Sequence, residues 1–209
     1  MKAPLLLAAA VAGALAAAAS AAAPTLTIGA SAPLVTYGKT VTLSGVLSTQ
    51  KSNQQITVTA QNCGKTAFTK AGNTKTVANG AYALPVTPTG LTVYQSKWKT
   101  TTSPKATVMV KPVVQLTRLA RGSFSTKVTA GLDLKGKTIL FQRYAKIKKR
   151  WVQVKKVVLS TSAPGTKPTV VSSASFKARV AAGARVRMLL SKAQAAPCYV
   201  SAASNAVRN

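Results

Sequence analysis

The sequence predicts an all-β protein made of two consecutive sandwiches. Glutamate is absent and threonine and valine are abundant, a composition that favours strands over helices. Short segments of alternating apolar and polar residues recur along the chain, and residues typical of turns separate them at intervals of about 8–12 residues. This rhythm is typical of β-sandwich domains.

The first half of the chain contains a series of such segments, which we expect to form strands at 25–28, 41–43, 56–60, 82–86, 91–98 and 106–110. Asn79-Gly80 is the strongest short hairpin signal in the chain. It predicts a tight hairpin in which residues 75–78 pair with the strand that follows.

The second half repeats the rhythm after Lys111-Pro112, where a proline cannot continue a strand ladder. Strands are expected at 113–116, 123–129, 137–144, 151–159, 175–180, 185–190 and 198–201. We therefore expect residues 23–112 to form the first sandwich and residues 113–209 the second, joined by a short, stiff linker.

Residues 1–22 have the features of a secretory signal peptide. Lys2 precedes an almost unbroken apolar run, and Ala19-Ser20-Ala21 supplies the small residues that signal peptidase requires. A transmembrane anchor is the alternative, but the run is short and weakly apolar. We expect cleavage near Ala21 or Ala22 and a mature chain that is secreted without an anchor into an extracellular or cell-wall setting.

Two stretches of the first half, YGKTVTLSGVLS at 37–48 and NGAYALPVTPTGLTVYQSKW at 79–98, resemble the immunoglobulin-like repeats of secreted bacterial, especially actinobacterial, proteins. In the second half, GKTILFQR, WVQVKKVVL and CYVSAASNAV are similar to the companion domain of such tandem proteins. The resemblance implies two tandem immunoglobulin-like sandwiches in an adhesive or structural extracellular setting. It implies no catalytic residues, and this sequence lacks the acidic loops with which many relatives hold Ca²⁺.

The available side chains exclude most catalytic chemistry. The chain has 29 Lys and Arg, one acidic residue, Asp133, and no His. No carboxylate pair exists for glycoside hydrolysis, no Ser-His-Asp triad can be assembled, and Zn²⁺ or Ca²⁺ would lack ligands. We therefore expect a protein that is not an enzyme and needs no cofactor or metal, with Asp133 at a turn or strand end.

The two cysteines, Cys63 and Cys198, fall in different expected domains. An even number of cysteines in an exported chain favours a disulfide, which would clamp one sandwich to the other. Two free thiols or an intermolecular bond are the alternatives. A catalytic cysteine is not expected, because no His or acid completes a relay.

Positive charge is the dominant signal. The formal net charge is 29 − 1 = +28, and loss of Lys2 with the signal peptide leaves 28 − 1 = +27. Residues 24–112 contain nine Lys and no acid, whereas residues 113–209 contain 19 Lys and Arg and one acid, a net charge of 19 − 1 = +18. The densest stretch surrounds a predicted hairpin and comprises Arg143, Lys146, Lys148, Lys149, Arg150, Lys155 and Lys156.

Alternation places four further cations on the outward faces of two strands that we expect in opposite sheets: Lys177, Arg179, Arg185 and Arg187. Tyr144 and Trp151 flank the predicted basic hairpin and are candidates for stacking on bases or sugar rings. A large aromatic residue of a sandwich more often fills the core, which is the alternative for Trp151.

This coat of cations predicts a non-enzymatic protein that associates with anionic polymers of its envelope or surroundings. The candidates are teichoic-type phosphates, acidic polysaccharide and an anionic lipid surface, held by many weak contacts and by counterion release. Non-specific binding of extracellular nucleic acid is one alternative. A spacer or assembly module that binds another protein, with incidental charge, is the second. For the charge itself, adaptation for solubility is the alternative to an anionic partner.

Overall fold

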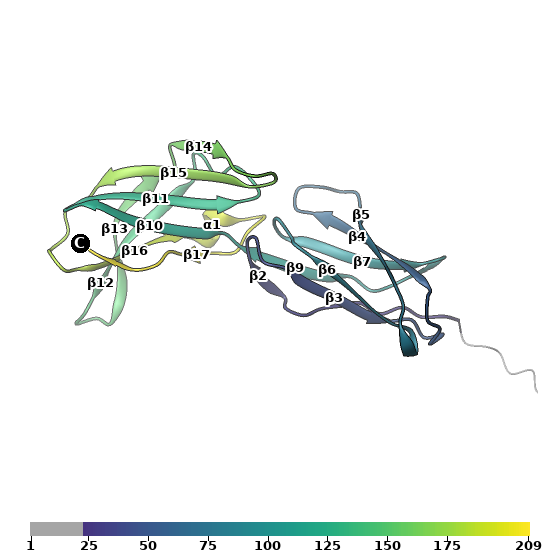
Figure 1. Ribbon diagram of the computed structural model, residues 1–209. Helices are drawn as coiled ribbons and strands as arrows, with labels where there is room; N and C mark the ends of the chain where they lie inside the picture. Colours follow the sequence, from purple (N-terminus) through teal and green to yellow (C-terminus); the bar gives the residue numbers. More distant parts are fainter. Residues whose placement is uncertain (1–22) are drawn as a thin grey trace, which may run out of the picture.

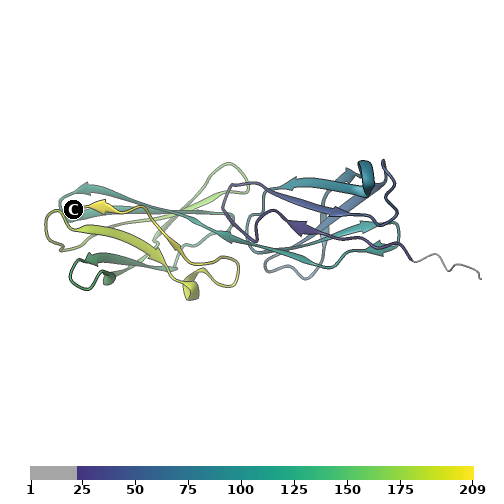
Figure 2. The same ribbon diagram turned by 90° about the horizontal axis from the view of Figure 1, so that it is seen from below.

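The computed structural model describes residues 23–209 as two β-sandwiches arranged end to end (Figure 1 and Figure 2). Strands β1–β9 build the first sandwich and strands β10–β18 the second, which confirms the predicted all-β fold class. Helical structure in the described part is limited to η1 (Ala78–Gly80) and α1 (Lys192–Ala195). The predicted signal peptide lies outside the described residues.

In the first sandwich, one sheet has the strand order β1-β3-β6 and the other has the order β2-β9-β7-β4-β5, with β8 paired to β7. β2 runs parallel to β9, and the other pairs are antiparallel. The strands are β1 (Gly29–Ala30), β2 (Leu34–Thr36), β3 (Val41–Val46), β4 (Gln55–Asn62), β5 (Thr69–Lys75), β6 (Ala81–Val86), β7 (Thr92–Trp98), β8 (Thr101–Thr102) and β9 (Ala106–Lys111).

In the second sandwich, the strand orders are β10-β11-β15-β14 and β13-β12-β16, with β17 and β18 on the free side of β16. This is the immunoglobulin constant-type arrangement with β13 as an added strand. The strands are β10 (Val113–Ala120), β11 (Ser123–Ala130), β12 (Thr138–Ala145), β13 (Arg150–Val158), β14 (Thr161–Pro164), β15 (Val170–Lys177), β16 (Arg185–Leu190), β17 (Ala202–Ala203) and β18 (Val207–Arg208).

The period-two alternation of the sequence produces the cores. In β4, Ile56 and Val58 are fully buried, while the threonines between and after them are only partly covered. The second sandwich centres on three phenylalanines, Phe124, Phe141 and Phe176, whose ring centroids lie 4.9–5.7 Å apart. Aromatic pairs at this spacing add stabilisation beyond the burial of their surface.

The predicted hairpin at Asn79-Gly80 is wrong. Both residues do adopt positive φ, 59° and 70°, as a tight turn requires. However, β5 pairs with β4 and β6 pairs with β3, so the turn crosses between the two sheets. The buried Thr76 ties the end of β5 to the loop before β4, because its hydroxyl donates to the carbonyl of Lys51 and accepts from the backbone N–H of Gln54.

Three strand predictions also differ from the structure. The segment 25–28 is reduced to a single bridge at Leu26, before β1. The strand predicted at 175–180 ends at Lys177, where Ala178 N–H turns to the carbonyl of Gly122. The segment 198–201 is irregular, because its backbone bonds the first sandwich rather than a neighbouring strand.

The joint between the sandwiches is closely packed. β9 passes into β10 through the buried Pro112. The N–H of Leu91 donates to the carbonyl of Cys198 at 2.8 Å, and the N–H of Val200 donates to the carbonyl of Val110 at 3.1 Å. Tyr37 and Val110 of the first sandwich belong to the same buried cluster as the core of the second. The two domains therefore share one apolar contact surface.

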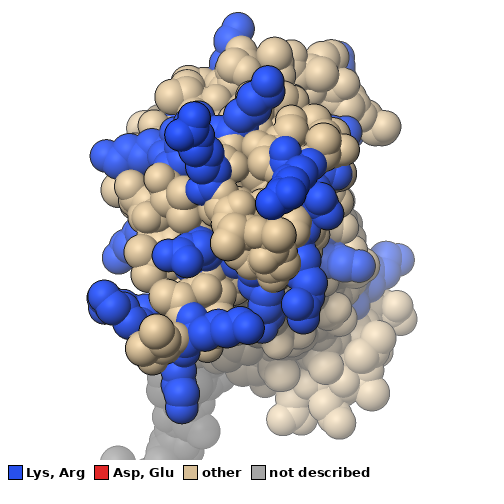
Figure 3. Space-filling model, turned by 90° about the vertical axis from the view of Figure 1, so that its left-hand side faces the viewer, with Lys and Arg blue, Asp and Glu red and all other residues tan. Residues whose placement is uncertain are grey.

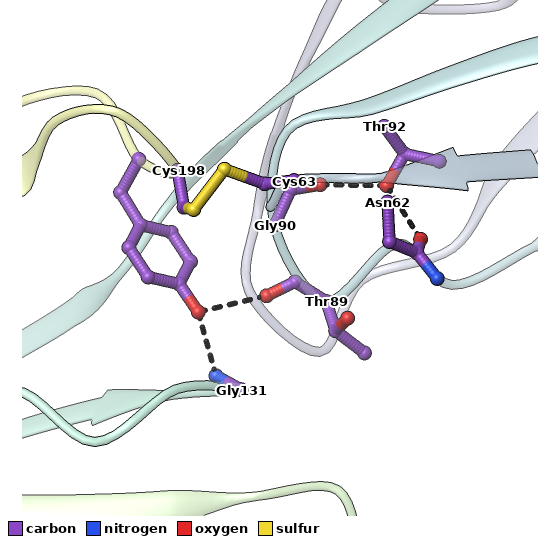
Figure 4. The surroundings of a disulfide bond; sticks show 8 residues. Asn62, Cys63, Thr89, Gly90, Thr92, Gly131 and Cys198 are labelled. Carbon is purple, nitrogen blue, oxygen red and sulfur yellow. Dashed lines mark hydrogen bonds between the residues drawn. A yellow bond between two sulfur atoms is a disulfide. The ribbon is translucent and has the colours of Figure 1, made fainter. Parts of the chain in front are cut away.

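A disulfide links Cys63, at the end of β4, to Cys198, which follows α1 (Figure 4). Their Cα atoms lie 5.4 Å apart, a separation typical of disulfides. Beside the bond, the hydroxyl of Tyr199 donates to the carbonyl of Thr89 and accepts from the N–H of Gly131, both at 3.0 Å. Burial raises the pKa of Tyr199 above its ordinary value, so the phenol keeps its proton. The joint is thus held by covalent, polar and apolar contacts.

Candidate polyanion-binding pole

The end of the second sandwich that lies away from the joint gathers most of its cations, and we call it the basic pole. Figure 3 looks onto this end, where Lys and Arg are spread over the visible face and no acidic side chain is seen. The pole is formed by the β10–β11 turn, the β12–β13 hairpin, the segment between β15 and β16, and the chain end. Its cations are Arg118, Arg121, Arg143, Lys146, Lys148, Lys149, Arg150, Lys177, Arg179, Arg185 and Arg208.

Asn209 connects the segments of the pole. Its side-chain oxygen accepts from the N–H of Gly122 at 2.9 Å, and its amide nitrogen donates to the carbonyl of Val180 at 2.7 Å. Its backbone bonds both Gly183 and Ala184. The residue is buried, so these bonds fix the β10–β11 turn against the β15–β16 segment. The cations on these loops are therefore carried by a fixed frame.

Two grooves open on the pole. The hairpin groove, about 660 Å³, lies between the β12–β13 hairpin and the segment 181–184. Its floor is mainly apolar, with Tyr144 and several alanines. Five cations line it: Arg143, Lys146, Lys148, Arg185 and Arg208. The turn groove, about 800 Å³, lies beside Gly122 and is lined by Arg121, Lys177 and Arg179. Both are of the size of small-ligand sites.

Tyr144 and Trp151 face each other across β12 and β13, with ring centroids 5.4 Å apart. The guanidinium of Arg187 lies 4.3 Å from the centre of the Trp151 ring and donates through Nε to Gln142 at 2.9 Å. Partial burial lowers the pKa of Arg187 below its ordinary value. Arg187 is thus engaged by the protein itself, and it covers the indole on which a base or sugar would stack. Trp151 lies outside the apolar core clusters.

The structure separates the remaining predicted binding residues. Arg143, Lys146, Lys148 and Arg185 meet at the hairpin groove, and Lys177 and Arg179 meet at the turn groove. Lys155 instead donates to the carbonyl of Lys177 at 2.9 Å and bridges the two sheets. Lys156 pairs with Leu140 nearer the middle of its strand. Three cations of the pole were not predicted as site residues: Arg118, Arg121 and Arg208.

No local signal marks Arg208, which enters the hairpin groove because β18 pairs with β16 opposite Arg185. Arg121 does carry a signal, since it directly precedes Gly122, which has a positive φ of 73° in the β10–β11 turn. This turn joins two predicted strands and lies at the same end of the sandwich as the basic hairpin. Its position would have identified Arg121 as a cation of the pole.

Asp133 lies in the turn between β11 and β12, at the joint end of the second sandwich. Its carboxylate accepts from the N–H of Lys135 at 2.8 Å and from the hydroxyl of Ser172 at 3.0 Å. The bond from Lys135 contributes most to lowering the pKa of Asp133 below its ordinary value. The single acidic side chain of the sequence is therefore a turn residue, and it lies far from the pole.

Asp133 should make the free energy of unfolding depend weakly on pH in the acidic range. Because its folded-state pKa is lowered, its contribution is present above the unfolded-state pKa and is lost as pH falls through the folded-state value. We expect the urea midpoint to stay constant from about pH 8 to pH 5 and to fall slightly below about pH 4. The Asp133→Asn variant should show no such fall. An equally steep fall in the variant would contradict this assignment.

The part of the chain that the structure describes holds no group of three His, Cys, Asp or Glu side chains suited to a metal ion. Between residues 23 and 209, no helix has the length and apolar character to cross a membrane.

Comparison with known proteins gave no matching family model and no matching curated protein. Among solved structures, the chain is similar to a tetra-tandem repeat from the extending region of a large adhesion protein, at 12% identity and a TM-score of 0.38. That similarity covers 90% of this chain and 49% of the other, so the chain spans about half of that structure. It is also similar to a marsupial T cell receptor, at 10% identity, a TM-score of 0.31 and coverages of 87% and 100%. Neither similarity bears on function.

Proposed function

We propose that this protein is an exported, non-enzymatic adhesive module that binds anionic polymers of the cell envelope or its surroundings through the basic pole. The observation that carries the proposal is the gathering of cations around two grooves at one end of a joined pair of domains. A solvated protein surface ordinarily mixes both signs of charge. Here, self-repulsion among the cations opposes folding, so their concentration favours a negatively charged partner.

The Cys63–Cys198 bond supports the extracellular setting. Disulfides persist in oxidising compartments and are rare in the cytosol. This one joins two domains at a buried interface, where Cys198 is nearly inaccessible. A structural bond of this kind fits a protein that folds after export.

The mechanism is multivalent. Each Lys or Arg that meets a phosphate or carboxylate of a polymer releases a condensed counterion, and the affinity falls as salt rises. The bonds of Asn209 fix the backbone of the β10–β11 turn and of the β15–β16 segment, so less loop freedom is lost there on binding than on a flexible basic tail. Teichoic-type polyphosphate, whose charges repeat along the chain, can engage several of these cations at once.

A salt-graded binding assay with poly(glycerol phosphate) tests the proposal. We expect the variant Arg143→Gln, Lys146→Gln, Lys148→Gln, Arg185→Gln to bind about 10- to 100-fold more weakly at ~0.1 M salt, with a shallower salt slope. The matched control removes the same charge from the first sandwich: Lys39→Gln, Lys51→Gln, Lys65→Gln, Lys75→Gln. Equal losses in both variants would show that net charge alone acts, and binding that ignores salt would refute the mechanism.

Competition with duplex DNA separates the polymer from nucleic acid as the preferred partner. We expect duplex DNA to compete no better per charge than poly(glycerol phosphate), because its bases are stacked inside the helix and only its phosphates meet the cations. Single-stranded DNA should gain no further advantage, because Arg187 already covers the ring of Trp151 on which an unpaired base would stack. A preference for single-stranded nucleic acid, lost in Trp151→Ala, would instead favour the nucleic-acid alternative.

A further inference from the structure

Two large apolar side chains are exposed at the basic pole, one at the tip of a hairpin and one at the end of a strand that leads into a turn. Ile147 is 99% exposed and lies between Lys146 and Lys148 in the β12–β13 hairpin. Leu119 is 60% exposed and lies in an irregularity of the β10 ladder, just before the β10–β11 turn. Single exposed apolar residues are common on proteins. Here both lie at the one end of the molecule where cations gather, each with a cation as its direct neighbour.

The local backbone holds Ile147 outward. Lys149 has a positive φ of 45°, and its N–H donates to the carbonyl of Lys146 at 3.2 Å, which closes a tight turn. The isoleucine is thus at the outermost position of the hairpin, while the neighbouring groove floor is formed by Tyr144 and alanines. The apolar surface of the pole therefore continues from the groove to the tip.

We propose that the basic pole docks on an anionic lipid bilayer, with Ile147 and Leu119 entering the boundary between headgroups and acyl chains. This deepens the proposed function and rests on it, because the same cations would meet the lipid phosphates. A surface that combines basic residues with projecting apolar ones matches the two layers of a membrane interface. A soluble polyanion would engage the cations but would leave both apolar tips in water.

The pole has the charge complementarity that such docking needs. Arg118 and Arg121 stand beside Leu119, and Lys146, Lys148 and Lys149 stand around Ile147. The sequence places no carboxylate side chain near either tip, since Asp133 lies at the joint end of the sandwich. Cations close to an anionic leaflet attract it, and this attraction falls off within a Debye length. Insertion of the tips would bring the cations within that range.

Sedimentation with vesicles tests this proposal. The disulfide-bonded chain, residues 23–209, is mixed with vesicles of phosphatidylcholine that contain or lack phosphatidylglycerol. We expect binding only with phosphatidylglycerol and a partition coefficient about tenfold lower for Ile147→Ser, because the buried apolar surface is lost. Leu119→Ser should act in the same direction. The matched control is Val77→Ser, which removes a side chain that is 61% exposed on the first sandwich and should change nothing.

A second measurement locates the tip. In an Ile147→Trp variant, brominated acyl chains should quench the new indole more strongly than the native tryptophans. Unchanged partition of Ile147→Ser, or absence of this quenching, would overturn the docking proposal. Binding of poly(glycerol phosphate) without binding of phosphatidylglycerol vesicles would also overturn it and would leave the proposed function standing. Failure to bind either would overturn both.

Discussion

Replacement of both cysteines by serine should lower the free energy of unfolding by about 4–5 kcal/mol. The Cys63–Cys198 bond closes a loop with a sequence separation of 135 residues, and a long loop gains much entropy in the unfolded chain when it is opened. Urea unfolding followed by circular dichroism measures the change.

The same variant should loosen the joint. The N–H groups of Leu91 and Val200 bond across it, so their amide hydrogens should exchange faster when the disulfide is absent. Chemical reduction of the wild-type protein is the control and should reproduce the stability of the double variant. Equal stability of the oxidised wild type and the variant would show that the disulfide adds nothing to the packed interface.

Phe141→Ala should cost about 3–5 kcal/mol of the stability of the second sandwich. Phe141 is fully buried, and its ring lies 4.9 Å from that of Phe124 and 5.1 Å from that of Phe176. Truncation leaves a cavity among three aromatic rings that fixed strands cannot fill.

Phe141→Leu, which keeps most of the apolar volume, is the matched control and should cost less than about 2 kcal/mol. Hydrogen exchange should show the loss in β11, β12 and β15, with the sheets of the first sandwich protected as before. If the two substitutions destabilised the protein equally, ring packing would not be what stabilises this core.

Period-two alternation predicted many strands well. β4 and β16 contain strict alternations of apolar with polar or basic residues, and one buried sheet face is enough to specify such a strand. β5, with the sequence TKAGNTK, shows no such pattern because it is an exposed edge strand that buries no apolar side chain. The Asn79-Gly80 turn was recognised from its residues, but whether a turn closes a hairpin or crosses between sheets depends on distant contacts such as those of Thr76.

The candidate site was predictable only in part. The hairpin cations are contiguous in sequence, so their proximity follows from local structure alone. Arg208 reaches the pole through the strand order of the sandwich, which no local pattern encodes, whereas Arg121 is marked by the turn glycine that follows it. Alternation correctly places the side chain of Arg187 on the face of β16 that is not occupied by Val186 and Met188. It does not reveal that the guanidinium lies over the ring of Trp151.

The position of the disulfide has a mechanical consequence. A pull on residues 23 and 209 can extend only 63 − 23 = 40 residues before Cys63 and 209 − 198 = 11 residues after Cys198. At about 3.5 Å per residue, these two segments together can extend to no more than about 180 Å. Strands β5–β16 lie within the covalent loop and bear no tension along their own backbone. Under tension, β1–β4 of the first sandwich and β17–β18 of the second can therefore be pulled out, while β5–β16 stay within the covalent loop.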